Sequence, residues 1–125
     1  MIGTLAQVAI GGAIGASARF GLGLWITRIA GPGFPLAVMT CNVIGSLLMG
    51  LFIVTAAQRG LTHLSPLVAT GLLGGFTTFS AFSLEAVTMM ERGEAGQAAA
   101  YILLSVGASI GGLYAGLMIA RGLFT

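Results

Sequence analysis

The chain has 125 residues, of which 57% are hydrophobic and 6% charged, whereas a soluble domain carries about 25% charged residues. Its five arginines and three glutamates are spaced so that the runs between them are long enough to cross a bilayer as helices. This composition excludes a soluble domain, and the scattered arginines form no basic patch for nucleic acid. The single cysteine, Cys41, excludes an internal disulfide.

The first apolar segment spans residues 2–29 and lacks the basic start of a cleaved signal peptide, so we expect it to remain as a helix. Gly11 and Gly15 form a small-xxx-small face, which lets membrane helices approach closely. Arg19 interrupts the segment, at a cost of about 2.5–3.5 kcal/mol if it lies at the bilayer centre. We expect its side chain to snorkel toward the membrane surface, with a place in an ion pathway as the alternative.

The second segment, residues 34–57, follows a Gly-Pro-Gly turn at residues 31–33. Asn42 and Ser46 lie four residues apart and therefore share one face of this helix. The amide of Asn42 can donate two hydrogen bonds. The sequence leaves open whether this amide bonds to a neighbouring helix or takes part in binding.

The third segment, residues 65–90, contains the most unusual part of the chain. Residues 71–83 combine glycines, threonines, serines and phenylalanines within an apolar stretch. Each Gly costs about 1 kcal/mol relative to Ala in a helix, and Ser and Thr side chains compete with the helical backbone bonds. A membrane tolerates a broken helix only where it is buried in protein or lines a watery cavity. We therefore predict a third helix that is broken near Gly74 to Thr77, as in the ion and substrate sites of transporters.

Such a break has two chemical consequences. It frees backbone carbonyl groups, which are ligands for a hard cation. Phe76, Phe79 and Phe82 recur every third residue, so a helix that starts at Thr77 would hold the three rings roughly on one side. Ring edges are electropositive and, with hydroxyl groups, can stabilise a small anion, although packing or lipid contact is the plainer role for rings at this spacing.

The fourth segment, residues 96–123, carries a polar stripe. Tyr101, Ser105 and Ser109 follow one another at four-residue intervals and so lie on one helical face. Gly112 and Gly116 form a GxxxG packing motif. The four segments together predict an all-α membrane protein with one four-helix domain over residues 1–125.

The remaining polar residues give no support for catalysis. The sequence contains no Ser/His/Asp set, no metal-spaced His or Cys cluster and no phosphate-binding loop, so we expect no enzyme activity. Glu85 is the one acid within a span. It could pair with an arginine, lie near a mouth or titrate, and the sequence does not choose between these roles.

The arginines give almost no preferred orientation. Four spans place Arg59 and Arg121 on one side of the membrane, and Arg28 and Arg92 on the other, with Arg19 added there if it snorkels that way. Since the positive-inside rule counts Lys and Arg near short loops, the chain can insert both ways. Two oppositely oriented copies can then pair about a two-fold axis in the membrane plane. We therefore predict an antiparallel, dual-topology homodimer.

Residues 71–85 read GLLGGFTTFSAFSLE, and this run closely resembles the signature of the microbial fluoride channels (Fluc, or CrcB). The resemblance extends to Gly11-Gly12 and Arg19 in the first segment, to residues 42–45 (NVIG) in the second and to the Tyr/Ser stripe of the fourth. It covers the whole chain in order. The motif of the third segment is specific, whereas four helices alone would not be.

The resemblance implies a passive, fluoride-selective channel that exports cytoplasmic fluoride and so lowers its toxicity. It implies antiparallel homodimers with two fluoride pathways, embedded as multi-pass proteins in the plasma membrane of a microbe, which is the inner membrane in a Gram-negative cell. It also implies a structural sodium ion at the dimer centre, held by the backbone carbonyls of Gly74 and Thr77 from each subunit. The expected partners are fluoride, the lipid bilayer and a second copy of the chain.

The residues expected in the fluoride pathway follow from the same resemblance. The family's paired pore phenylalanines fall on Phe79 and Phe82, its pore asparagine on Asn42, and its polar track on the stripe of the fourth segment. With the hydroxyl at the break, the set is Asn42, Thr78, Phe79, Phe82, Tyr101, Ser105 and Ser109. Arg19 and Glu85 match family positions whose roles stay open. Phe76 stands where relatives often carry Leu, and Ala81 stands where many carry Thr, so a fluoride contact made by that threonine is in doubt here.

Two other classes compete with this interpretation. A small proton-coupled, dual-topology multidrug exporter has the same size, but it would require a membrane-embedded Glu in the first segment, where this chain has none. A non-transporting scaffold protein would explain the glycine faces but not the Phe/Thr/Ser run. Release of fluoride from liposomes without release of chloride distinguishes the fluoride channel from the other two classes.

Overall fold

The structure, a computed structural model, describes residues 1–31 and 33–124, and within these residues it is helical with no strand. Its elements are α1 (Ile2–Ala30), α2 (Leu36–Arg59), a 3₁₀ turn η1 (Thr62–Leu64), a π-helix η2 (Pro66–Leu73), α3 (Gly74–Phe76), α4 (Phe79–Glu91) and α5 (Ala95–Leu123). Four stretches are long and apolar enough to cross a membrane, with η1 to α4 (Thr62–Glu91) counted as the third. The expectation of four membrane-spanning helices is confirmed.

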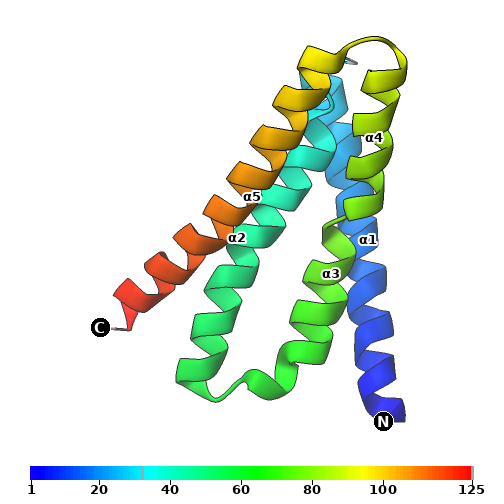
Figure 1. The fold of residues 1–125 in the computed structure, drawn as a ribbon. Coiled ribbons are helices and arrows are strands. Elements are labelled where there is room, and N and C mark those ends of the chain that lie inside the picture. The colour runs from blue at the N-terminus through cyan, green and yellow to red at the C-terminus, as the bar shows by residue number, and fades with distance from the viewer. Residues whose placement is uncertain (32, 125) are drawn as a thin grey trace.

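Glycines decide how the spans pair. A Cβ atom on Gly11 or Gly15 of α1 would collide with the backbone of η2, at the carbonyls of Leu67 and Leu72 respectively. The predicted small-xxx-small face therefore brings α1 into direct backbone contact with the third span. On the other side of the molecule, α2 packs along α5, as Figure 1 shows.

Glycines also allow the backbones of α2 and α5 to approach closely. A Cβ atom on Gly50 of α2 would meet the Leu113 carbonyl, and one on Gly116 of α5 would meet the Leu47 carbonyl. Gly112 also faces α2, whereas a Cβ atom on Gly107 would have nothing within 4 Å. The GxxxG motif of the fourth segment is thus a packing face against α2, as such motifs are in membranes.

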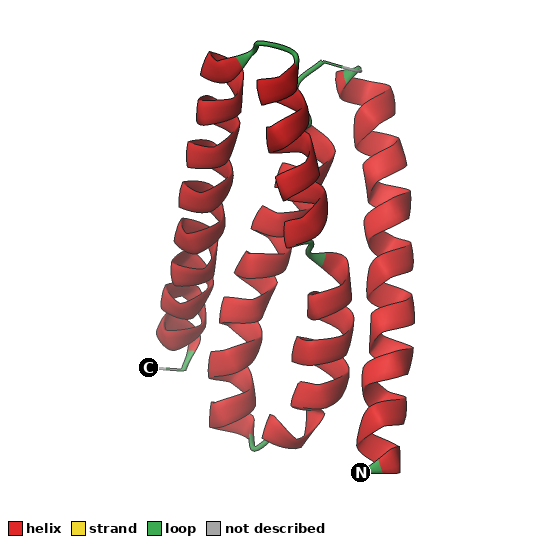
Figure 2. Ribbon diagram, turned by 45° about the vertical axis from the view of Figure 1, so that its right-hand side comes forward, coloured by secondary structure: helices red, strands yellow, loops and turns green. Residues whose placement is uncertain are grey.

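The third span is not one continuous α-helix. It begins as a π-helix with Pro66 at its first position, preceded by Ser65, whose side chain forms no cap hydrogen bond. It is then interrupted at Thr77 (φ −93°, ψ 159°) and Thr78 (φ −153°, ψ 122°), which are both extended. Figure 2 shows this non-helical link about midway along the span.

The break lies at the C-terminal edge of the predicted position, and this changes the arrangement of the phenylalanines. Because the helix restarts at Phe79 rather than at Thr77, Phe76 belongs to the preceding element, α3. Its ring lies 3.3 Å from the position that a Cβ atom on Gly45 would occupy. The expectation of a helix that starts at Thr77 and holds the three rings roughly on one side is therefore wrong, since only Phe79 and Phe82 lie on the helix that restarts.

The two ends of the chain lie at the same end of the bundle, on different helices. Both termini and the turn between α2 and η1 are at one end of the bundle, and the α1–α2 and α4–α5 connections are at the other (Figure 1). Arg59 lies at the first end, with its guanidinium 5.4 Å from the centre of the Phe124 ring. Arg28 and Arg92 lie at the opposite end, where α1 and α4 finish.

Candidate functional site

Asn42 of α2 fastens the two halves of the third span. Its Oδ1 accepts a 2.7 Å hydrogen bond from the Thr78 N–H, and its Nδ2 donates a 3.1 Å bond to the Thr78 carbonyl. One side chain thus pairs both backbone groups of an extended residue, which a membrane interior would otherwise penalise. Of the two roles that the sequence left open, bonding to a neighbouring span is observed, and Asn42 also borders the cavity described below.

The Thr78 side chain starts the second half of the span. Its Oγ1 accepts a 3.2 Å hydrogen bond from the Ala81 N–H, which makes it the N-cap of α4. The Thr77 N–H and its Oγ1 both donate to the Leu73 carbonyl, each at 3.1 Å. The helical bond to Leu73 is therefore kept before the break and joined by the Thr77 hydroxyl, whereas after the break the Thr78 side chain replaces a helical backbone acceptor.

The same bonds leave two carbonyls without their helical donors. In an unbroken helix the Gly74 carbonyl would accept from the Thr78 N–H, and the Thr77 carbonyl from the Ala81 N–H. Here the Thr78 N–H donates to Asn42, and the Ala81 N–H donates to Thr78 Oγ1. Gly74 and Thr77 are the two residues whose carbonyls the family resemblance assigns to a structural cation.

Arg19 reaches the break instead of the membrane surface. Its Nε donates a 3.1 Å hydrogen bond to the Gly75 carbonyl, which an α-helix would have paired with the Phe79 N–H. The snorkelling interpretation is therefore wrong, because the side chain is held by a carbonyl that the break released. It also means that Arg19 counts for neither side in the charge balance, which becomes two arginines against two.

A cavity of about 300 Å³ opens beside the break, between α2, α4 and α5. It brings together residues that are distant in the sequence and that are mostly polar or aromatic. Its lining consists of Asn42, Ser46, Thr77, Thr78, Phe79, Phe82, Ser105, Val106, Ser109 and Ile110. Six of the seven residues predicted for the anion pathway line this cavity, and the exception is Tyr101.

Phe79 and Phe82 form a pair at the cavity with very different exposure. Their ring centroids are 5.4 Å apart and their planes are tilted by 51°. Phe82 is 7% exposed, whereas Phe79 is 75% exposed. The cavity is thus closed on the inner side by one ring, while the other ring stands at the surface of the single chain.

Ser105 places a hydroxyl at the buried side of the cavity. The residue is 3% exposed. Its Oγ lies within reach of the Tyr101 hydroxyl, which donates to Glu85, but forms no hydrogen bond of good geometry within the described part of the chain. Leaving a buried polar group unpaired costs about 1–3 kcal/mol. An unpaired hydroxyl beside phenylalanine rings and an amide can bind a small anion by donating its hydrogen.

Tyr101 lies behind Phe82, away from the cavity lining. It is fully buried, its ring centroid is 5.3 Å from that of Phe82, and its hydroxyl donates a 2.9 Å hydrogen bond to Glu85 Oε2. The structure thus answers where Glu85 points, namely to the one tyrosine of the polar stripe. Sequence reasoning did not join these two residues, because they belong to different spans.

Ser46 lines the cavity and was not among the predicted site residues. The signal that could have found it is its position, one helical turn after Asn42 on the same face. Ala81 does not line the cavity, so the missing threonine hydroxyl at this position removes no lining group from it.

A broken membrane span that borders a cavity of hydroxyl, amide and aromatic groups defines a multi-pass membrane protein built to handle a small solute. The family model described as CrcB-like protein, Camphor Resistance (CrcB), matches residues 6–117. The chain therefore belongs to the CrcB family.

Individual relatives match over nearly their full length. A protein of Ruegeria sp. (strain TM1040), named fluoride-specific ion channel FluC, is 61% identical over 126 residues that cover 100% of both chains. Proteins with the same name from Roseobacter denitrificans and Jannaschia sp. (strain CCS1) are 62% and 71% identical, over 97% and 75% of this chain and 98% and 90% of their own.

Proposed function

We propose that this chain is a fluoride-selective passive ion channel that lets cytoplasmic fluoride leave the cell and so lowers its toxicity. The observation that carries the proposal is the cavity beside the break, where the Ser105 hydroxyl is buried without a hydrogen bond of good geometry among the described residues. The names of its relatives, which are fluoride-specific ion channels, support the choice of ion.

The chemistry of the lining suits a small anion that has lost its water. The Ser105 hydroxyl can donate to it directly, and the edges of Phe79 and Phe82 present positive potential. Among the residues that line the cavity there is no ionised side chain. An anion held only by dipoles is bound weakly enough to move on, which conduction requires.

The working unit in this proposal is an antiparallel homodimer with two anion pathways. The arginine balance of two against two supports insertion in both orientations. Phe79, at 75% exposure, stands on the open side of the cavity. A second copy in the opposite orientation would cover this ring and close each cavity into a pathway.

The proposal includes a structural sodium ion at the dimer centre. The donors available fit the group, since sodium is a hard cation that takes oxygen ligands and the break diverts the helical donors of the Gly74 and Thr77 carbonyls. Gly74 is exposed on the single chain, so a second copy can bring its own pair of carbonyls to the same ion. The ion would tie the two broken spans together.

The proposal is tested by ion release from proteoliposomes loaded with fluoride, beside an identical preparation loaded with chloride. Fluoride release without chloride release is expected, in buffers that contain sodium. Equal release of both anions would refute selectivity. A folded dimer that releases neither would refute the channel function and direct the next test to cation-coupled export.

A further inference from the structure

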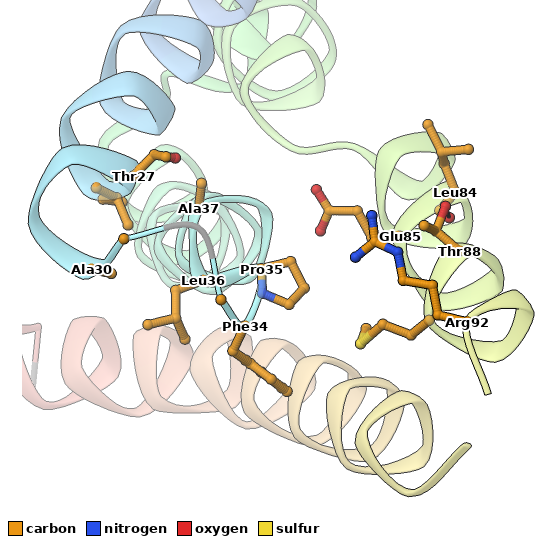
Figure 3. Close-up of a pocket in the computed structure, with 14 residues that line it drawn as sticks. Thr27, Ala30, Phe34, Pro35, Leu36, Ala37, Leu84, Glu85, Thr88 and Arg92 are labelled. Atoms are coloured by element: carbon orange, nitrogen blue, oxygen red, sulfur yellow. Dashed lines mark hydrogen bonds between the residues drawn. The ribbon is translucent and has the colours of Figure 1, made fainter. Parts of the chain in front are cut away.

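A second hollow of about 290 Å³ lies at the membrane end of the molecule where α1 ends, α2 begins and α4 ends. Its walls come from the end of α1, the described part of the α1–α2 connection and the start of α2, and from the last two turns of α4 with Arg92 directly after them (Figure 3). None of these residues lines the cavity beside the break. The hollow has room for a small ion together with water molecules, each of which occupies about 30 Å³ in the liquid.

Three side chains in contact with one another separate the two hollows. Phe82 lines the cavity beside the break, and its ring packs on Tyr101 at a centroid distance of 5.3 Å. The Tyr101 hydroxyl donates to Glu85, and Glu85 lines the second hollow. These contacts connect the buried cavity to the second hollow through three side chains.

Two opposite charges line the second hollow, one in the last part of α4 and one directly after it. Glu85 and Arg92 are seven residues apart, two turns of helix, and Figure 3 shows both side chains extending from the α4 side toward the hollow. Among the described residues, Arg92 is the one cation that lines it. The other charged groups at this end, Arg28, Glu91 and Glu94, are not part of its walls.

We propose that the second hollow is the mouth of the anion route at this membrane end of the chain and that Arg92 attracts small inorganic anions into it. This inference rests on the proposed channel function and assigns a site and a residue to its entrance. An anion approaching the partition meets the carboxylate of Glu85, which repels it. Arg92 offsets that repulsion from an exposed position directly after α4. Because its guanidinium remains hydrated there, it attracts the anion without binding it tightly.

The size of the effect follows from Coulomb's law in water. A unit charge about 6 Å from an anion changes its local concentration about three-fold at low salt. Since the Debye length falls from about 30 Å at 0.01 M to about 3 Å at 1 M salt, the effect disappears at high ionic strength. Arg92 should therefore alter the rate of entry, and leave the choice between fluoride and chloride unchanged.

The experiment measures initial rates of fluoride release from proteoliposomes at low fluoride concentration. The buffers contain the sodium salt of an impermeant organic anion at about 0.01 M, where charges are weakly screened, or at about 1 M, where they are strongly screened. The variant is Arg92→Gln, with Arg92→Lys to restore the charge. The matched control is Arg28→Gln, which removes the same charge at the same membrane end from a residue that does not line the hollow. We expect Arg92→Gln to be about three-fold slower than wild type at low salt and equal to it at high salt, with both other variants close to wild type throughout.

Three results would overturn the inference and leave the channel function standing. The first is an unchanged rate for Arg92→Gln at low salt. The second is equal slowing by Arg28→Gln, because it would indicate a general surface potential in place of a mouth. The third is slowing that persists at high salt or in Arg92→Lys, which would indicate a structural role. A wild-type protein that releases no fluoride would overturn the proposed function and this inference with it.

Discussion

Replacing Ser105 by alanine should make the protein more stable and less active. Ser105 is 3% exposed and its Oγ forms no hydrogen bond of good geometry among the described residues. Most buried serines lose stability on such a change because a bonded neighbour is left unpaired. Here the serine hydroxyl itself is the unpaired group, so its removal relieves a cost that the native chain carries.

The magnitude follows from these contacts. An unpaired buried polar group costs about 1–3 kcal/mol, and alanine also has the better helix propensity, so the free energy of unfolding should rise by about 1–3 kcal/mol. A hydrogen bond to an ion contributes about 1.5–3 kcal/mol, and each 1.4 kcal/mol is a factor of ten. Fluoride release should therefore slow by about ten-fold or more.

Two assays on the same preparations check both halves of this prediction. Unfolding in mixed micelles can be followed by the fluorescence of the single tryptophan, Trp25, and fluoride release can be measured from liposomes. Ser109→Ala is the matched control, because Ser109 lies one turn further along the stripe and lines the same cavity but is partly exposed. It should slow fluoride release without a gain in stability. A Ser105→Ala protein that unfolds more easily and conducts normally would refute the reasoning.

Three further outcomes follow from contacts at the break and between spans. Asn42→Ala leaves the N–H and carbonyl of an extended residue unpaired, so it should lower the free energy of unfolding by about 2–4 kcal/mol and slow fluoride release; stability equal to wild type would contradict the fastening role. Gly15→Ala should cost about 1–3 kcal/mol, because its Cβ atom would overlap a backbone carbonyl of η2, whereas Gly21→Ala in the same helix has open space and serves as control. Phe79→Ile should slow fluoride release by up to about ten-fold with little loss of monomer packing, since the side chain is 75% exposed. Phe82→Ile should lower both fluoride release and stability. Normal release by both variants would exclude a role for the ring edges.

The sequence was sufficient for every feature that depends on local pattern. Apolar runs of membrane length predict the four spans, because a bilayer requires about 20 apolar residues per helix. Glycines at four-residue intervals predict the close faces at Gly11, Gly15 and Gly116. The Gly/Thr/Ser content of residues 71–83 predicts the interruption of the third span, and the motif within this run led to the family.

Contacts between residues of different spans could not be predicted from the sequence. The sequence favours a position at the membrane surface for the Arg19 side chain, because it does not show that the break makes the Gly75 carbonyl available as a hydrogen-bond acceptor. The exact position of the break, at Thr77 and Thr78, depends on Asn42, which lies in another span and supplies the bonds that an extended residue lacks.

The tertiary structure also divided the polar stripe of the fourth segment. Tyr101, Ser105 and Ser109 share one helix face, yet the first is turned to Glu85 and the other two line the cavity. Periodicity determines which residues share a face, because it follows from the geometry of one helix. Which partner each residue meets along that face depends on where the neighbouring spans begin, bend and end, and only the packed bundle decides this.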